Sequence, residues 1–156
     1  MIAMSKVKLT QSAYPVLVLR ALESGLRNYD EIQECILGKY KKHISTKTIY
    51  RHIKLIKSLG FKIIDESPYV IWPSDKKPIA ADGEKFGHAA YPIMMLVVLQ
   101  SECIFYEQII ERINFIYNTK IERKAIGRNL DILGAIGYRI FDRCYNLFSY
   151  QLDGCD

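Results

Sequence analysis

Apolar side chains recur at helical spacing in the middle of the first half of the chain. Between Ile49 and Leu59 they follow one another at intervals of four, three and three residues, which places them on one face of a helix. Ser45 is a favourable N-cap before this run, and Gly60 is a favourable residue just beyond its end. Because β-prone residues follow Gly60, the pattern predicts a helix that leads into a short strand.

The opposite face of this predicted helix is basic. Lys47, Arg51 and Lys54 lie close together on it, and Tyr50 and Lys57 flank them. A helix with an apolar back and a basic, aromatic-bearing front suits docking on an acidic partner. Ordinary core helices with a solvated charged face show the same pattern, so this face alone leaves both interpretations open.

Two further helices are predicted before this one, and a β-hairpin after it. Ser12 can cap the first helix, and Pro15 falls in its first turn, where the missing amide hydrogen costs nothing. Asn28, with Glu31 in the first turn after it, is typical of the start of the second helix. The remaining expected elements are an apolar helix at 16–22 ended by Gly25, a basic turn at 37–43, and strands at 61–64 and 69–72.

The same order of elements is predicted a second time. Shifted by 77 residues, segment 8–65 aligns with segment 85–142 without a gap, and 19 of the 58 paired positions are identical. Such an internal duplication predicts two similar small domains. We place the first at 1–72, a Pro- and Gly-containing linker at 73–84, and the second at 85–156. In the second domain we expect helices at 92–101, 106–117 and 122–136 and strands at 138–143 and 147–152, which makes the fold mainly α with small β-hairpins.

Composition and charge narrow the choice of partner. The 156 residues are 49% apolar and 25% charged, which is typical of a folded globular chain, and the net charge is +5. The charge is uneven, because residues 8–65 carry 11 Lys or Arg against 5 Asp or Glu, whereas residues 85–142 carry 7 against 6. A polyanionic partner fits this balance, and the first domain carries the larger positive charge.

Other functional classes find no support in the sequence. The 4 cysteines stand apart from one another and from histidines at zinc spacing, so no metal and no other cofactor is expected. There is no Gly-rich phosphate loop, paired-carboxylate cluster or nucleophile motif, so we do not expect an enzyme. The longest apolar stretch, 89–99, is too short for a bilayer, and no signal peptide is recognised, which predicts a cytoplasmic protein without a membrane partner.

The segment STKTIYRHIKLIKSLGFKI resembles a known DNA-binding element. It is similar to the recognition helix and wing entry of the DeoR-like and WYL-type bacterial transcription regulators, with their pattern Ser-x-x-Thr-Ile-Tyr-Arg-x-Ile and then Leu and Gly-Phe. The resemblance implies two tandem winged helix-turn-helix domains and sequence-specific binding of double-stranded DNA in the major groove. The second copy has Glu122, Ala125 and Gly127 where this pattern has Ser, Thr and Tyr.

The resemblance and the charge together give a set of expected DNA-contacting residues. Side chains near the start of the predicted helix reach base edges, and lysines further along it hold phosphates. The second domain keeps a basic start but has Asp131 in place of Lys54, so auxiliary DNA contact and a protein-interaction role stay open there. The expected residues are Ser45, Thr46, Lys47, Thr48, Tyr50, Arg51, Lys54 and Lys57, the turn residues Lys41 and Lys42, and Arg123, Lys124 and Arg128 in the second domain.

The function that these residues and the resemblance predict is that of a nucleoid-associated transcriptional regulator that binds duplex DNA. Two alternatives remain: a plasmid or phage replication initiator, and a winged-helix adaptor that grips proteins without reading DNA. A homodimer or a protein partner through the second domain is compatible with each of them. His52, near the apolar side of the helix, is expected to be a buried, hydrogen-bonded polar residue rather than a metal ligand or a catalytic group.

Overall fold

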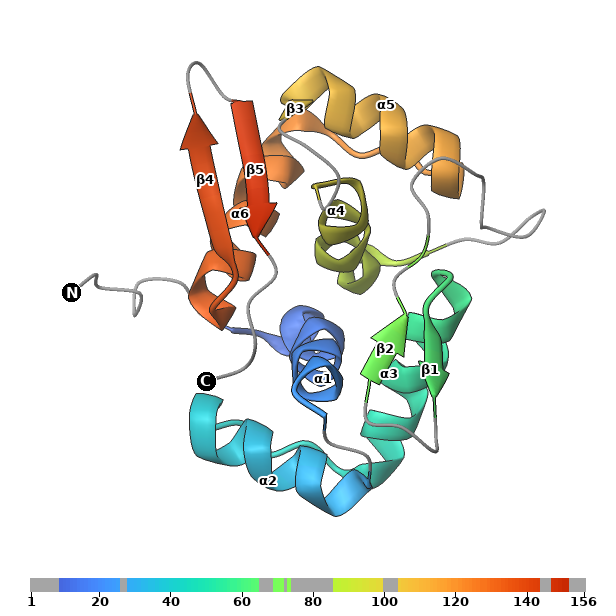
Figure 1. Ribbon diagram of the computed structural model, residues 1–156, viewed down its shortest axis with the longest axis vertical. Helices are drawn as coiled ribbons and strands as arrows, with labels where there is room; N and C mark the ends of the chain where they lie inside the picture. Colours follow the sequence, from blue (N-terminus) through green and yellow to red (C-terminus); the bar gives the residue numbers. More distant parts are fainter. Residues whose placement is uncertain are drawn as a thin grey trace.

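The computed structural model describes residues 9–25, 28–64, 69–71, 73, 86–99, 104–143 and 147–151. These residues are mainly α-helical, as the sequence predicts, with six α-helices, two short 3-10 helices and five short strands among them. Figure 1 shows α1 and α4 side by side at the centre, with the other elements arranged around them.

The first half consists of three helices and a hairpin. Its elements are the 3-10 helix η2 (Gln11–Ala13), α1 (Tyr14–Glu23), α2 (Tyr29–Tyr40), α3 (Thr46–Ser58), β1 (Lys62–Ile64) and β2 (Tyr69–Ile71). The predicted caps of α2 and α3 are confirmed, because Asn28 accepts a hydrogen bond from the Glu31 amide and Ser45 accepts one from the Thr48 amide. Gly60, after α3, has a φ of 105°, which explains why glycine stands there.

Two local predictions for this half are wrong. Ser12 does not cap α1; it lies inside η2, where its hydroxyl bonds that of Thr10, and α1 begins at Tyr14 as a continuation of η2. The basic turn at 37–43 is shorter than expected, because α2 continues to Tyr40. The chain leaves the helix at Lys41, which adopts the left-handed conformation with a φ of 59°, and not at Gly38, which is an ordinary helical residue.

The second half follows the same order. Its elements are η3 (His88–Ala90), α4 (Tyr91–Leu99), β3 (Ile104–Phe105), α5 (Tyr106–Tyr117), α6 (Arg123–Ile136), β4 (Arg139–Arg143) and β5 (Leu147–Gln151). The 3-10 helices, the three helices and the first hairpin strand each start 77 residues after their counterparts. The left-handed residue recurs as well, since Asn118, with a φ of 51°, stands 77 positions after Lys41.

The sequence pattern did not predict strand β3, and it did not predict the 3-10 helices η2 and η3 either. The described strands form two sheets, a β1–β2 hairpin and a three-stranded antiparallel sheet in the order β3–β5–β4. In the second sheet Ile104 pairs with Phe148 and Ile140 with Tyr150. β3 is two residues long and lies directly before α5, so no alternation of apolar and polar residues marks it.

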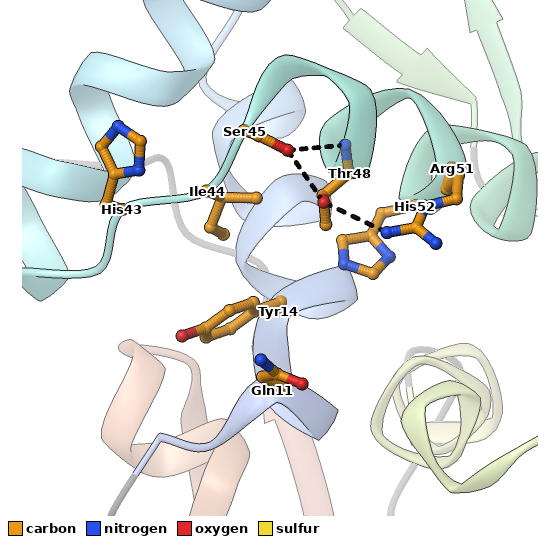
Figure 2. Close-up of a pocket in the computed structure, with 8 residues that line it drawn as sticks. All are labelled: Gln11, Tyr14, His43, Ile44, Ser45, Thr48, Arg51 and His52. Atoms are coloured by element: carbon orange, nitrogen blue, oxygen red, sulfur yellow. Dashed lines mark hydrogen bonds between the residues drawn. The ribbon is translucent and has the colours of Figure 1, made fainter.

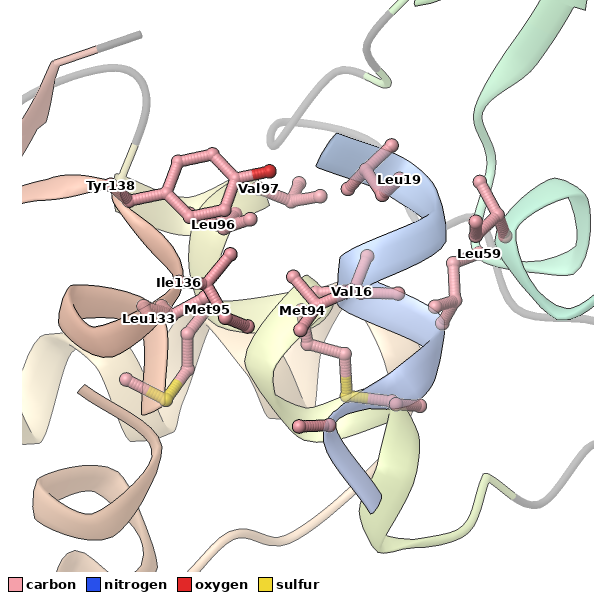
Figure 3. Close-up of a cluster of buried hydrophobic side chains, with 14 of the residues drawn as sticks. Val16, Leu19, Leu59, Met94, Met95, Leu96, Val97, Leu133, Ile136 and Tyr138 are labelled. Carbon is pink, nitrogen blue, oxygen red and sulfur yellow. The ribbon is translucent and has the colours of Figure 1, made fainter. Parts of the chain in front are cut away.

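One buried cluster extends through both halves. All eight positions from Pro92 to Leu99 of α4 are buried, and so are positions 15–22 of α1, as expected for helices that are apolar on nearly every side. Figure 3 shows Val16 of α1 beside Met94 of α4, with Leu59 and Ile136 on either side of them. Cys35 is half-buried against this cluster.

The predicted linker at 73–84 lies almost entirely outside the described residues, apart from Pro73, which is buried. The other three cysteines lie outside them too. In the described part of the chain, no helix combines the length and the apolar character that crossing a membrane requires.

Candidate nucleic-acid interface

Helix α3 has one buried face and one charged face. Ile49 and Ile56 are completely buried, and α3 packs against α1 and α2. The face opposite them carries Lys47, Arg51 and Lys54, all of them exposed. The spacing of the apolar residues therefore determines which side of the helix faces outward. The three basic residues are exposed because they lie on that side.

Hydrogen bonds organise the first turn of α3. The Ser45 hydroxyl accepts from the Thr48 amide at 3.2 Å and donates to the Thr48 hydroxyl at 3.0 Å. The Arg51 guanidinium donates to the same Thr48 hydroxyl at 3.2 Å. The cap that starts the helix thus also orients Arg51 (Figure 2), while leaving most of its guanidinium donors directed to solvent.

An aromatic pair lies beside the cations. Tyr50 is 49% exposed, and the centroid of its ring lies 6.5 Å from that of the Tyr29 ring on α2. The Lys54 ammonium lies 5.5 Å from the Tyr50 ring, within the range of a cation–π interaction. Lys57, Thr46 and Ser45 are exposed as well, so every predicted residue of α3 is accessible except Thr48, which is half-buried.

A hollow of about 440 Å³ opens between the start of α3 and the start of α1. Figure 2 shows Arg51 and His52 from α3 above it, and Gln11 and Tyr14 below it. His52 is half-buried there, and the pKa of its imidazole is lowered, first by burial and then by the charge of Arg51. The expectation of a buried His52 is therefore wrong; the residue is half-buried and forms part of the wall of an open hollow.

The predicted turn residues lie between α2 and α3. Lys41 is exposed and its ammonium donates to the Gly38 carbonyl at 3.3 Å, while Lys42 is half-buried. His43 follows and lines the hollow. The turn thus places its cations next to the first turn of α3, which extends the positive surface.

The corresponding face of α6 is less positive. Lys124 and Arg128 are exposed at the positions of Lys47 and Arg51. Arg123 forms a salt bridge with Glu107 on α5 and its guanidinium carbon lies 4.6 Å from the centre of the Tyr106 ring. The pKa of Glu107 is lowered by a hydrogen bond from its own backbone amide and then by Arg123. The Glu107 carboxylate therefore lies next to Arg123, the first basic residue of α6, and offsets its charge.

Some residues around the α3 face were not predicted from the sequence. Gln11 and Tyr14 line the hollow, and Tyr29 supports Tyr50 from the neighbouring helix. Tyr14 and Tyr29 are identical in the two copies, which marks them in the sequence. That identity did not indicate that they lie beside the α3 face. Asn129, at the place of His52, is buried and donates to the Ala125 carbonyl at 2.8 Å.

The arrangement presents an ordered set of cations and hydrogen-bond donors on an exposed helical face. Among the described residues there is no cluster of three His, Cys, Asp or Glu side chains able to hold a metal ion. Comparison with profiles of known protein families, with curated proteins and with solved structures finds no match for the chain.

Proposed function

We propose that the chain is a sequence-specific double-stranded DNA-binding protein, a transcriptional regulator built from two tandem winged helix-turn-helix domains. In this proposal α3 is the principal recognition helix. Its exposed face supplies what major-groove reading requires, namely a guanidinium near the start of a helix and lysines along the same side. That single face, Lys47, Arg51 and Lys54 opposite Ile49 and Ile56, carries the proposal.

The order of elements supports the winged-helix assignment. Each half has three helices followed by a hairpin, and in the second half β3 precedes α5 and joins the hairpin sheet. Such a hairpin next to the third helix is the wing in that architecture. Winged helices also bind proteins, so the fold alone does not give the function.

The hydrogen bonds at the start of α3 support a division of roles among its cations. Arg51 is oriented by Thr48 and presents a planar guanidinium, which can form two hydrogen bonds to a guanine edge. Lys54, above the Tyr50 ring, is a point charge suited to a phosphate. Lys57 and the turn residues Lys41 and Lys42 extend the same positive track.

Equilibrium binding of the full chain to duplexes selected from a random pool tests the proposal. Arg51→Ala should cost roughly 1–3 kcal/mol on the selected sequence and flatten the preference at one base position. Lys54→Ala should weaken selected and unrelated duplexes alike and reduce the slope of log K against log salt by about one unit. Arg112→Ala removes an arginine from α5, outside the α3 face, and should change neither.

Three results would contradict the proposal. Absence of binding to any duplex at low salt, with a protein partner retained in a salt-insensitive way, would favour the adaptor alternative. If Arg51→Ala behaves like Lys54→Ala, the helix positions the protein on DNA but does not read bases. Binding confined to repeated origin sequences rather than promoters would point to a replication initiator instead of a regulator.

A further inference from the structure

Two tyrosine hydrogen bonds connect the halves of the chain in a reciprocal way. The Tyr40 hydroxyl, at the end of α2, donates to the Ile136 carbonyl at 2.8 Å, and the Tyr117 hydroxyl, at the end of α5, donates to the Leu59 carbonyl at 2.9 Å. Tyr117 stands 77 positions after Tyr40, and Ile136 stands 77 positions after Leu59. The hydrogen bond from the first half to the second and the one from the second half to the first therefore join equivalent pairs of positions.

Equivalent elements also meet one another. The 3-10 helices η2 and η3 pack together, and so do α1 and α4. A reciprocal pair of bonds and the self-contact of equivalent elements are the marks of an isologous interface, in which a two-fold axis relates the partners. A head-to-tail arrangement would join two different surfaces and would not produce them. Figure 1 agrees, with α2 and α5 on opposite sides of the α1–α4 pair and α3 opposite α6.

Among the described residues, a polar contact of Arg20 departs from this symmetry. Arg20 on α1 donates to the Gly137 carbonyl at 3.3 Å and its guanidinium carbon lies 4.6 Å from the centre of the Tyr138 ring. The Tyr138 hydroxyl donates to Glu23 at 2.8 Å. Val97 occupies the place of Arg20 in the other half, so this polar contact has no symmetric copy there. This polar contact joins the end of α6 to α1, and together with the shared core it stabilises the association of the two halves.

We propose that one chain binds an inverted-repeat DNA site with two unequal half-sites at a fixed separation. The inference rests on the proposed function and adds the form of the target to it. A protein with two-fold symmetry places its two recognition helices on DNA in opposite orientations, so the symmetry of the site mirrors that of the protein. Here the two-fold lies within one chain, and α3 and α6 occupy its two equivalent positions.

The half-sites are unequal because the two helices have different outer faces. Relative to α3, α6 has Asp131 in place of Lys54 and glycines at 127 and 134 in place of Tyr50 and Lys57. Lys124 and Arg128 remain exposed at their equivalent positions. The first half-site is therefore bound through base and phosphate contacts, and the second mainly through Arg128, next to a carboxylate that phosphate repels.

Selection of binding sites from random duplexes with the full chain provides the test. The expected consensus is a well-defined half-site and, at one spacing, a weaker half-site in inverted orientation. On synthetic duplexes, turning the weaker half-site into a direct repeat should lower the affinity at least about fivefold, and so should one inserted base pair between the halves. Native mass spectrometry should find one chain on each duplex.

Point variants assign the half-sites to the helices. Arg51→Ala should remove base preference in the stronger half-site, and Arg128→Ala should do so only in the weaker one. A direct repeat, a single half-site indifferent to Arg128→Ala, or two chains on each inverted repeat would overturn the inference and leave DNA binding intact. Failure to bind any duplex would instead overturn the proposed function itself.

Discussion

Replacing Tyr117 with phenylalanine isolates the hydroxyl that joins α5 to the end of α3. The side chain of Tyr117 is completely buried, and its hydrogen bond to the Leu59 carbonyl, 2.9 Å long, lies in the interior. Burial raises the pKa of the phenol, so it remains a donor throughout the ordinary pH range. Phenylalanine keeps the ring and its edge-on contact with Phe86, at 5.9 Å between centroids, and removes the hydrogen bond alone.

The expected loss follows from the burial of the acceptor. Removing one partner of a buried hydrogen bond leaves the other unsatisfied, which costs about 1–3 kcal/mol. Tyr40→Phe is the matched control, because it removes the equivalent hydrogen bond to Ile136 in a partly exposed setting, where water can replace the hydroxyl. That variant should cost only about 0.5–1.5 kcal/mol.

Urea unfolding followed by far-ultraviolet circular dichroism measures both variants. With a slope of about 2 kcal/mol per molar urea, a loss of about 2 kcal/mol lowers the midpoint by about 1 M. Unchanged slopes in the two variants would show that the midpoints report stability. If Tyr117→Phe leaves the midpoint where it was, the Leu59 carbonyl is accessible to water. If Tyr40→Phe costs as much as Tyr117→Phe, water does not replace the hydroxyl at the Ile136 carbonyl. Either result refutes the reasoning from burial.

Three further predictions concern caps, glycines and a histidine. Ser45→Ala should cost about 1 kcal/mol in urea unfolding, because its hydroxyl caps α3, whereas Glu122→Ala, at the cap of α6 with no side-chain bond there, should change stability by less than about 0.5 kcal/mol. Gly134→Ala should stabilise α6 by about 0.5–1 kcal/mol, since an added Cβ meets open space, while Gly60→Ala, at a φ of 105°, should cost about 1–3 kcal/mol. Because the pKa of His52 is lowered in the native protein, the unfolded chain binds the proton more readily as the pH falls. The free energy of unfolding should therefore decrease as the pH drops below about 6.5. His52→Gln should reduce that decrease when unfolding is measured at about pH 7.5 and about pH 5.

Local chemistry allowed several helix boundaries to be predicted from the sequence. The cap at Asn28 and the glycine at position 60 are positions where one side chain, or the lack of one, decides the local backbone conformation. The predicted helix at 106–117 matches α5 at both ends. Where a weaker local signal was used, the prediction was wrong, as at Ser12, because the 3-10 helix before α1 already satisfies the start of that helix.

Features that depend on distant contacts could not be predicted. Strand β3 exists through its pairing with β5, which is far away in the chain, so that Ile104 lies opposite Phe148. The salt bridge of Arg123 with Glu107 joins two helices, and no spacing in the sequence singles out that carboxylate. The hollow beside Arg51 lies between the start of α1 and the start of α3. Its walls come from segments distant in the sequence, and the spacing of apolar residues within each helix does not show that they meet.

The identical pair Tyr40 and Tyr117 shows why the halves are best tested together. In the sequence these residues are one identical position of the repeat, but in the structure each donates a hydrogen bond to a carbonyl of the other half. Separating the halves would leave both carbonyls without these donors and would expose the buried faces of α1 and α4 that now pack together. A half that failed to bind DNA would then report on its own folding and not on its reading of DNA. Single arginine substitutions on α3 and α6 avoid this, because both sites are exposed and leave the interface unchanged.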